Sequence, residues 1–504
     1  MTIQPARKWT IHLIPHVHLD IGYTDYQAKV AELHNRNLDR ALAALRANPQ
    51  FAFSVDGSFV LKQYLDSRTP ERAEEVLDAV RSGRLGVNAL YALLLAGVAG
   101  IEECYRAAYY YSALARAERL PMRYANLTDV PAYPWSMPSM LAALGIPAVM
   151  VMANHEHMSI PVTDELTLHS PCRWQGPDGA TILAFFADHY AQLPFMASDP
   201  PTVVGLAAAL ADFIRPYERD DYLPHDLPLV GTHMDNEDLA AAEGSLVARW
   251  NARFAYPRLV YATVGSYLDT VAVLGDQLPV VHGDAGSNWE DGVTAHAKVV
   301  AELRDAQAAM LVAETATALT SLVARGLRAV RVELDRAWEG LLIGCEHTWT
   351  SRHATVRPGT DQEVDQLDWK AHHIHTATRV GRDETRRAMS QLGELITTDG
   401  PSLVLFNPLS WERRDEVQVE LPVGSLLRDS EGSVVPVDVI DREAGVARVR
   451  FRTGLLPPLG YRVIRVEPRE EEDAVTADPA NPVPIPVVET DRYRTVIDPV
   501  SGHL

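Results

Sequence analysis

The sequence predicts a multidomain chain with an N-terminal α/β domain, a central bundle of about three helices and a C-terminal β domain. The first part alternates short apolar runs with helical patterns, and the middle part is almost purely helical. The last part has the pattern of short strands separated by Pro, Gly and Asp turns. A chain of 504 residues is also too long for one compact core. We expect domains at residues 1–280, 281–397, 398–470 and 471–504.

The α/β domain is predicted from strand-like and helical runs that alternate along its length. The strand-like runs are Ile11–Ile14, Phe51–Val55, Ala148–Val151, Ile182–Phe186 and Leu227–Val230. Helical spacing lies between them, at Ala28–Ala47, Pro70–Ser82 and Ile101–Leu120. Such alternation favours a parallel sheet covered by helices, either open or closed into a barrel-like sheet. In both arrangements, polar groups that do chemistry gather at the carboxyl ends of the strands.

The central and C-terminal parts are predicted from the same kind of pattern. Helical periodicity fills Lys298–Arg325, Glu333–Ile343 and Val364–Leu392. The strands expected after residue 398 are Ser402–Phe406, Glu416–Leu421, Val435–Ile440, Ala447–Phe451 and Tyr461–Val466. An acidic, proline-rich linker (Glu467–Pro486) follows. The last residues have the form of a strand that enters a turn, which we interpret as the first strand of a truncated β-sandwich.

Charge and composition exclude several classes of partner. The net charge of −21 disfavours nucleic acid and anionic membranes, and it suits a neutral ligand such as a sugar. Three widely spaced cysteines (Cys104, Cys172 and Cys345) argue against a disulfide framework and a thiolate metal site. The N-terminus lacks a signal-peptide core, and we expect no apolar run long enough to span a bilayer. We therefore expect a cytoplasmic protein, and a homo-oligomer is compatible with the sequence.

The densest set of chemically useful side chains follows the first predicted strand. Pro15 ends the strand, and the next eight residues read His16-Val-His18-Leu-Asp20-Ile-Gly22-Tyr23. His18 and Asp20 are two residues apart, so at the end of an extended strand their side chains point the same way. A neutral imidazole beside a carboxylate suits a borderline divalent cation such as zinc. This segment therefore predicts a metal site with Tyr23 as an aromatic wall.

Three further clusters supply residues that could complete a site. Asp129 ends a short strand before a loop with prolines and Trp135, and it could ligate a metal, attack an electrophile or cap the next turn. His233 and Asp235 follow the strand at Leu227–Val230. Trp289, flanked by polar side chains, is similar to a sugar-binding wall. Two carboxylates can cleave a glycosidic bond, and a metal can bind a diol or activate water; the residues alone do not choose between these chemistries.

Taken together, these segments resemble glycoside hydrolase family 38, the metal-dependent α-mannosidases. The entry motif of that family is Pro-His-x-His-x-Asp-x-Gly-Trp, and this sequence matches it from Pro15 to Tyr23, with Tyr in place of the last Trp. The resemblance implies that His18 and Asp20 bind the metal and that Tyr23 packs on the sugar. It also implies that Asp129 is both metal ligand and nucleophile, and that Asp235 is the acid/base. The site would then lie in an N-terminal β/α barrel-like domain, of the type found in glycoside hydrolases and deacetylases.

The resemblance runs in the same order along nearly the whole chain. Trp174-Gln-Gly-Pro-Asp-Gly179 is similar to a hairpin of the family, and Glu346-His347 to its second helical junction. Leu405–Trp411 is similar to the start of its first β domain. From this likeness we expect substrate contacts from Tyr23, Trp135, Trp289 and His347.

The fourth metal ligand is where this sequence departs from the family pattern. The family takes that ligand from a His just before its helical domain, where this chain has Glu290-Asp291. We expect His233 to replace it, with His282 and Glu290 as alternatives. The expected cofactor is one divalent metal per active site, zinc by resemblance, although His and Asp ligands also suit cobalt or manganese.

The function that this resemblance implies is a metal-dependent retaining glycosidase acting on α-mannosides or related glycosides. Two alternatives stay open. One is a metal-dependent carbohydrate deacetylase on a related barrel, and the other is a carbohydrate-binding relative with impaired catalysis.

Overall fold

The computed structural model describes residues 7–129, 133–154, 161–197, 202–240, 243–286, 290, 293, 296–324, 331–349, 351–354, 356–468 and 487–496. The chain divides into two compact units, Met1–Ala388 and Met389–Leu504. The α/β sheets and most of the helical segment therefore belong to one unit, whereas the finer boundaries expected from the sequence stay predictions.

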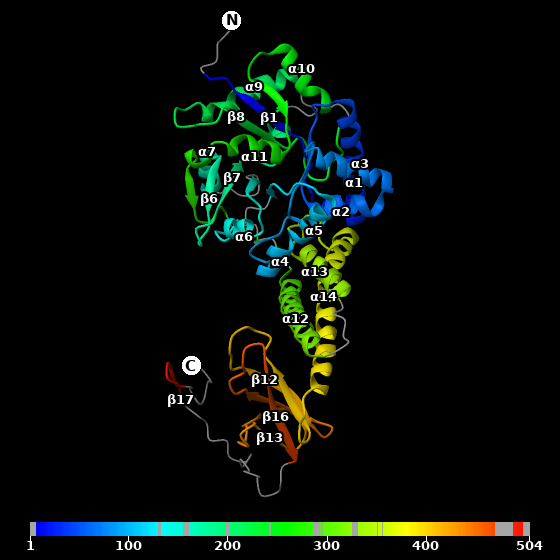
Figure 1. Cartoon of the computed structure of the whole chain (residues 1–504), viewed down its shortest axis with the longest axis vertical. Coiled ribbons are helices and arrows are strands. Elements are labelled where there is room, and N and C mark those ends of the chain that lie inside the picture. The colour runs from blue at the N-terminus through cyan, green and yellow to red at the C-terminus, as the bar shows by residue number, and fades with distance from the viewer. Residues whose placement is uncertain are drawn as a thin grey trace. The chain divides into compact units, whose positions relative to one another are not determined.

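Two parallel sheets of the first unit contain its N-terminal strands (Figure 1). β1 (Thr10–Ile14) lies between β8 (Asp226–Val230) and β9 (Arg258–Tyr261), and all three are parallel. β2 (Phe53–Val55) pairs in parallel with β3 (Leu85–Val87). Residues of β1 that face the core, such as Ile11 and Leu13, are fully buried, as the apolar run predicts.

The third sheet of this unit has five strands. β4 (Ala125–Asp129), β5 (Ala148–Ala153) and β7 (Thr181–Ala187) are parallel neighbours. β6 (Cys172–Gln175) forms an antiparallel hairpin with β7, and β10 (Val280–His282) pairs in parallel with β6. Within the described residues these strands form three hydrogen-bonded sheets. The α/β class is therefore confirmed, and closure into a barrel stays a prediction.

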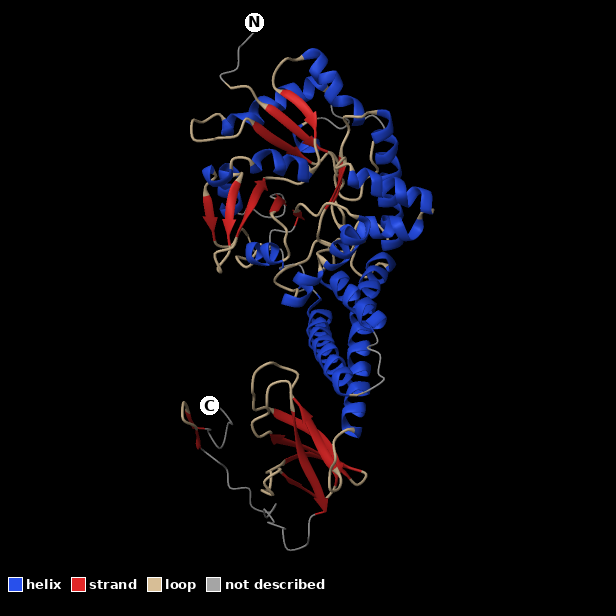
Figure 2. Cartoon of the chain, in the orientation of Figure 1, coloured by secondary structure: helices blue, strands red, loops and turns tan. Residues whose placement is uncertain are grey.

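Helices lie around these sheets (Figure 2). They are α1 (Gln27–Ala47), α2 (Ser58–Ser67), α3 (Pro70–Arg81), α4 (Ile101–Arg106), α5 (Tyr109–Glu118), α6 (Met137–Ala143), α7 (Pro161–His169), α8 (Gln192–Met196), α9 (Val203–Ile214), α10 (Leu246–Arg253) and α11 (Val264–Ala272). The helical stretch expected over Ile101–Leu120 is divided into α4 and α5. At the division, the carbonyl of Ala107 accepts a hydrogen bond from the backbone N–H of Tyr91 (2.6 Å), a residue outside both helices, instead of continuing the helix.

In the described part of the central segment there are three helices, α12 (Ala297–Val323), α13 (Arg331–Cys345) and α14 (Asp361–Glu394). They share one apolar core, to which α12 contributes Leu303, α13 contributes Trp338 and α14 contributes Ile374. By length and composition α12 is the one helix in the described part of the chain that could cross a membrane. The expectation that no apolar run is that long is therefore wrong. Leu303 and Met310 of this helix are nevertheless fully buried in the protein core.

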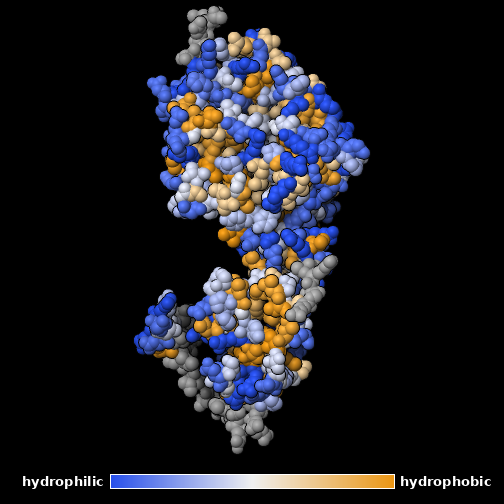
Figure 3. Space-filling model, in the orientation of Figure 1, coloured by the Kyte–Doolittle hydropathy of each residue, from blue (hydrophilic) through white to orange (hydrophobic). Residues whose placement is uncertain are grey.

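The second unit is built from antiparallel strands. One sheet has the order β11-β16-β13 and another β12-β15-β14, and β17 pairs with β18. Their bounds are β11 (Ser402–Phe406), β12 (Glu416–Pro422), β13 (Ser425–Arg428), β14 (Asp438–Glu443), β15 (Val446–Arg452), β16 (Tyr461–Pro468), β17 (Val487–Glu489) and β18 (Arg494–Val496). Leu427, Phe451 and Ile464 fill its core. Figure 3 also shows apolar surface over this unit, and Val423 and Ile440 are among its exposed apolar side chains.

Candidate metal centre and active site

Four buried side chains of the first unit converge on one point. They are His18, Asp20, Asp129 and His347, and one ligand atom from each lies within 4.8 Å of the others. The Nε2 atom of His18 lies 3.3 Å from Asp20 Oδ1 and 3.6 Å from Asp129 Oδ2. The Nε2 atom of His347 lies 3.1 Å and 3.3 Å from the same two oxygens. We call these four residues the metal-ligand cluster.

The parallel sheets bring three members of this cluster together. His18 and Asp20 follow β1, and the backbone at His18 pairs with that at Asp235, which follows the neighbouring strand β8. Asp129 is the last residue of β4 and has a φ of 67°, a left-handed conformation that Asp tolerates better than most residues. Such conformations gather at functional sites, where the surrounding structure holds them.

His347 comes from the end of α13, far away in the sequence. The backbone N–H of Leu95 donates to Cys345, and the N–H of His347 donates to Leu93. These two hydrogen bonds attach the end of α13 to the segment after β3. The fourth corner of the cluster is therefore set by long-range backbone pairing.

Each histidine of the cluster has a carboxylate behind it. Asp56 Oδ2 lies 2.7 Å from His18 Nδ1 and also accepts from the backbone N–H of Leu19. The other oxygen of Asp56 accepts from Asn126 Nδ2 (2.6 Å) and Thr128 Oγ1 (2.5 Å). Burial raises the pKa of Asp56, but His18 and these donors outweigh it and lower that pKa to about 2. Asp56 therefore stays ionised and keeps His18 Nε2 turned toward the cluster.

The second histidine also has a carboxylate beside its far nitrogen, here as an ion pair and not as a hydrogen bond. Glu346 Oε1 lies 2.8 Å from His347 Nδ1, and Glu346 Oε2 accepts from Lys370 Nζ at 2.9 Å. Burial raises the pKa of Glu346, but the charges of Lys370 and His347 bring it down to about 2. Two histidines that each carry a carboxylate on the far nitrogen form an arrangement common around bound metals.

The cluster fits a divalent metal. Within the described residues, no hydrogen bond reaches His18 Nε2, His347 Nε2 or Asp20 Oδ2, although all three atoms are buried. Ligand atoms on one tetrahedral zinc at about 2.0–2.2 Å would lie about 3.3–3.6 Å apart, and the four distances above are close to this. Burial lowers the pKa of both imidazoles, yet the facing carboxylates raise it well above its usual value. The site therefore favours positive charge.

Asp235 lies beside the cluster and differs from Asp129 in its environment. Tyr190 donates its hydroxyl to Asp235 Oδ1 (2.6 Å), and the rings of Tyr190 and His18 lie 4.6 Å apart. Burial and the charge of Asp20 raise the pKa of Asp235 above its usual value. Burial also raises the pKa of Asp129, but His18 and His347 hold it below its usual range. The pKa of Asp235 is therefore raised, as expected of an acid, and that of Asp129 is lowered, as expected of a nucleophile.

Tyr23 follows Asp20 in the loop after β1 and is half-buried. Burial and the charges of Asp20, Asp235 and Asp129 raise its pKa. Its contact with substrate stays a prediction. The backbone N–H of Tyr23 donates to Gln366 Oε1 of α14 (2.6 Å). The helical segment therefore also holds the loop after β1.

His233 does not join the cluster, which corrects the expected fourth ligand. Its Nδ1 lies 2.9 Å from Thr232 Oγ1, and its Nε2 accepts from the backbone N–H of Ala240. The two alternatives also lie elsewhere, since His282 is exposed on β10 and Glu290 accepts from the N–H of Gly97. His347, expected to contact substrate, occupies the fourth position instead.

The two tryptophans expected to contact substrate are not among the residues that converge here. Trp135 is 42% exposed, and it donates its backbone N–H to Asp284 and its indole N–H to the backbone of Gln175. Trp289 lies outside the described residues.

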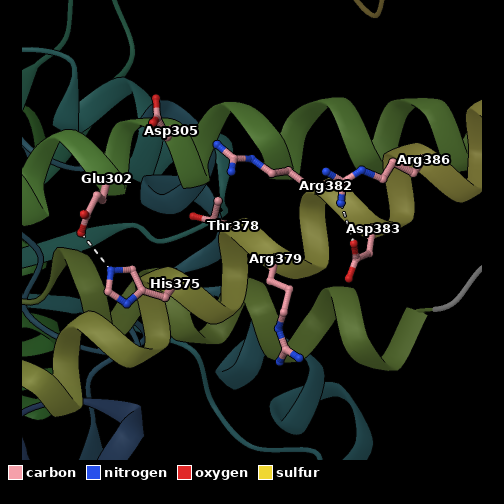
Figure 4. Close-up of a pocket in the computed structure, with 8 residues that line it drawn as sticks. All are labelled: Glu302, Asp305, His375, Thr378, Arg379, Arg382, Asp383 and Arg386. Carbon is pink, nitrogen blue, oxygen red and sulfur yellow. Dashed lines mark hydrogen bonds and ion pairs between the residues drawn. The ribbon is translucent and has the colours of Figure 1, made fainter. Parts of the chain in front are cut away.

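A separate groove lies between α12 and α14 (Figure 4). Charged side chains line it, and several pair with one another, such as His375 with Glu302 and Arg386 with Asp383, each at 2.9 Å. No member of the metal-ligand cluster lines this groove, so it is not part of the site described above.

Gly231 packs closely against the backbone of Tyr190, and a substitution at Gly231 tests how much this contact matters for stability. It has a φ of 75°, and a Cβ there would lie 1.8 Å from the carbonyl oxygen of Tyr190. We expect Gly231→Ala to lower the free energy of unfolding by about 3 kcal/mol or more, through strain and overpacking together. Urea denaturation measures this. Gly145→Ala is the matched control, since its φ is 74° with nothing within 4 Å. Equal losses in both variants would show that the contact with Tyr190 is unimportant.

Comparisons with known proteins agree with this geometry. A family model described as "Glycosyl hydrolases family 38 N-terminal domain" matches residues 8–284, more than half of the chain. An alpha-mannosidase from Enterococcus faecalis V583 is similar in structure, with a TM-score of 0.75 and 19% identity over 97% of this chain and 60% of that one. A glycosyl hydrolase family 38 protein from Enterococcus faecalis is also similar, with a TM-score of 0.65 and 18% identity. The match covers 98% of this chain and 58% of that one.

At these identities the two structures show a shared fold, and this chain spans about 60% of the length of each. No curated protein matches the chain significantly. Because the family model covers the strands that carry His18, Asp20, Asp129 and Asp235, the match includes most of the site. The chain therefore belongs to glycoside hydrolase family 38.

Proposed function

We propose that this protein is a metal-dependent retaining glycosidase that hydrolyses α-mannosides or related glycosides. The observation that carries the proposal is the buried His18, Asp20, Asp129 and His347 cluster with Asp235 beside it. Membership of family 38 and the fold shared with an alpha-mannosidase support the same chemistry. The donor set of two imidazoles and two carboxylates suits zinc.

The roles of the two catalytic carboxyl groups follow from their surroundings. In this proposal Asp129, held as a carboxylate, attacks the anomeric carbon and forms a bond to it as the glycosidic C–O bond breaks. Asp235 gives its proton to the departing oxygen. Water then attacks the same carbon and gives a proton to Asp235, and the bond to Asp129 breaks. His18, Asp20, Asp129 and His347 would hold a divalent metal, which would supply positive charge for the hydroxyl groups of the sugar.

The sugar itself would rest against Tyr23, which follows Asp20 in the loop after β1. Contacts from Trp135 and Trp289 stay predictions, as does the mannose preference. The cytoplasmic location, the lack of nucleic-acid and membrane partners and a homo-oligomeric state also stay predictions.

The function is tested by incubating the chain with a nitrophenyl α-mannoside and zinc. We expect release of nitrophenol, and proton NMR of the first sugar product should show the α-anomer, because two displacements retain the configuration. Initial formation of the β-anomer would contradict the proposed nucleophile. Acetate release from an acetylated sugar without glycosidic cleavage would favour a deacetylase. Sugar binding without any turnover would favour a non-catalytic relative.

Replacing Asp235 by Asn tests the proposed acid. We expect kcat/KM on a disaccharide to fall by about 10²–10⁴-fold, because the leaving oxygen then receives no proton. The kcat/KM of the variant on a dinitrophenyl glycoside should fall much less, since that leaving group needs no protonation. Because Asp235 acts in its protonated form and its pKa is raised, wild-type kcat/KM should fall as pH rises through that pKa. The variant should lack this decline.

The matched control for this experiment is Asp238→Asn in the same loop. Asp238 is exposed and paired with Arg36 and Arg40 at the surface, so its loss should leave both substrates unaffected. Equal losses of Asp235→Asn on both substrates would remove Asp235 from the acid role.

A further inference from the structure

Lys370 on α14 is a buried cation close to the metal-ligand cluster. It is 1% exposed and is the one buried Lys or Arg in the described part of the chain. Its ammonium group donates to Glu346 Oε2 (2.9 Å), to the backbone carbonyl of Glu346 (2.9 Å) and to that of Thr348. These bonds use all three of its N–H donors. Its Nζ also lies 5.2 Å from the ring centre of Trp349.

All of these contacts fall within one short segment of the chain. Residues 346–349 follow α13 and contain His347, the fourth corner of the cluster. Lys370 therefore holds the backbone on both sides of His347. It also pairs with Glu346, whose other oxygen lies 2.8 Å from the far nitrogen of the His347 ring. A change at Lys370 would affect both the position and the orientation of that ring.

The charges near the cluster explain why a cation is kept here. Asp20, Asp56, Asp129 and Glu346 are all buried carboxylates. A divalent metal neutralises only part of this charge, and Lys370 supplies more. Burial of a lone ammonium group is unfavourable, and the carboxylate of Glu346 compensates for it. Asp56 behind His18 accepts from the neutral donors Asn126 and Thr128, whereas Glu346 accepts from Lys370 as well as from the neutral donor Thr348.

The same face of α14 also reaches the other side of the site. Gln366 precedes Lys370 by four residues, so the two side chains lie on one face of the helix. Gln366 Oε1 accepts from the N–H of Tyr23, which follows Asp20 in the loop after β1. α14 therefore contacts the two loops that supply three of the four ligands.

We propose that Lys370 is a positioning residue for the metal centre: through Glu346 it fixes His347 with Nε2 directed at the metal. The proposal rests on the metal site of the proposed function, but not on the identity of the sugar. It makes the helical segment a determinant of metal affinity.

The test measures zinc affinity by competition with a chromophoric chelator, separately from catalysis. We expect Lys370→Met to weaken zinc binding by about 10–100-fold, the usual effect of losing a contact behind a metal ligand. Lys62→Met is the matched control, because Lys62 also pairs with carboxylates (Asp66 and Glu339) but on α2. It should bind zinc as the wild type does.

A double variant separates positioning from folding. Lys370→Met alone leaves the buried carboxylate of Glu346 without its lysine partner and lowers the thermal stability of the metal-free protein. In Glu346→Gln/Lys370→Met both charges are gone, so metal-free stability should recover. Zinc affinity should stay about 10–100-fold weaker than that of the wild type, because the amide of Gln at position 346 is a poorer partner for His347 than a carboxylate.

The outcomes distinguish this proposal from the function on which it rests. Wild-type zinc affinity in the double variant, or in a folded Lys370→Met, would overturn the positioning role and leave the glycosidase proposal standing. A wild-type protein that binds no divalent metal would overturn both. Weak zinc binding with recovered metal-free stability would support the positioning role even if no glycoside is hydrolysed.

Discussion

Asp129→Asn is expected to reduce nitrophenyl α-mannoside turnover by at least about 1,000-fold, because an amide cannot replace the attacking carboxylate. The loss has two sources, since Asp129 Oδ2 also lies within 3.3–3.6 Å of both histidines of the cluster. Zinc affinity should therefore fall as well. Steady-state kinetics measured at saturating zinc separates the two effects, because only the loss of the nucleophile then remains.

Asp276→Asn serves as the control for this variant. The side chain of Asp276 is 96% exposed and pairs with Arg173 at the surface, so this variant should keep wild-type turnover. Wild-type turnover in Asp129→Asn would show that this residue is not the nucleophile and would remove the proposed mechanism.

Removal of the metal is expected to abolish turnover and to lower the thermal stability of the protein. Without a cation, the buried carboxylates of Asp20 and Asp129 lie in one cluster with no metal to neutralise their charge. A ligand at 100 times its Kd stabilises the folded state by about 2.7 kcal/mol, and that contribution is lost with the metal.

Dialysis against a chelator followed by calorimetry and an activity assay measures both effects. Zinc added back should restore turnover and the melting temperature together. Full activity after removal of every divalent metal would contradict the metal-dependent mechanism, whereas activity regained with cobalt but not zinc would correct only the identity of the metal.

Part of the site could be predicted because its residues obey local rules. His18 and Asp20 are two residues apart at a strand end, and that spacing alone puts both side chains on one side. Asp129 also ends a strand, where an α/β fold places its polar groups. In each case the relevant geometry is set within a few residues of the ligand.

His347 could not be assigned in this way, because its place depends on pairing between distant segments. The hydrogen bonds from Leu95 to Cys345 and from His347 to Leu93 attach the end of α13 beside the strand ends. A signal was present in the sequence: Glu346 and His347 are adjacent in a loop rich in functional groups. The sequence favours His233 as the fourth ligand because it lies two residues before Asp235. In the structure both of its ring nitrogens lie within hydrogen-bond distance of Thr232 or Ala240 instead.

The fold shows the same division between local and long-range control. Strands β1, β8 and β11 lie close to their expected bounds because each is an apolar run that turn residues end. The break between α4 and α5 was not visible, since it depends on a hydrogen bond from Tyr91 to Ala107. The pairing order of the sheets, such as β1 between β8 and β9, also depends on segments far apart in the sequence.

Metal content per chain in three proteins tests most directly whether His347 completes the metal site of this family 38 protein. The proteins are the wild type, His347→Ala and His233→Ala, each loaded with zinc, dialysed and analysed by mass spectrometry of the metal. The wild type and His233→Ala should each retain about one equivalent, and His347→Ala should retain far less, because losing one of four ligands weakens binding strongly. A full equivalent in His347→Ala, or its loss only in His233→Ala, would contradict the cluster of His18, Asp20, Asp129 and His347 as the metal site.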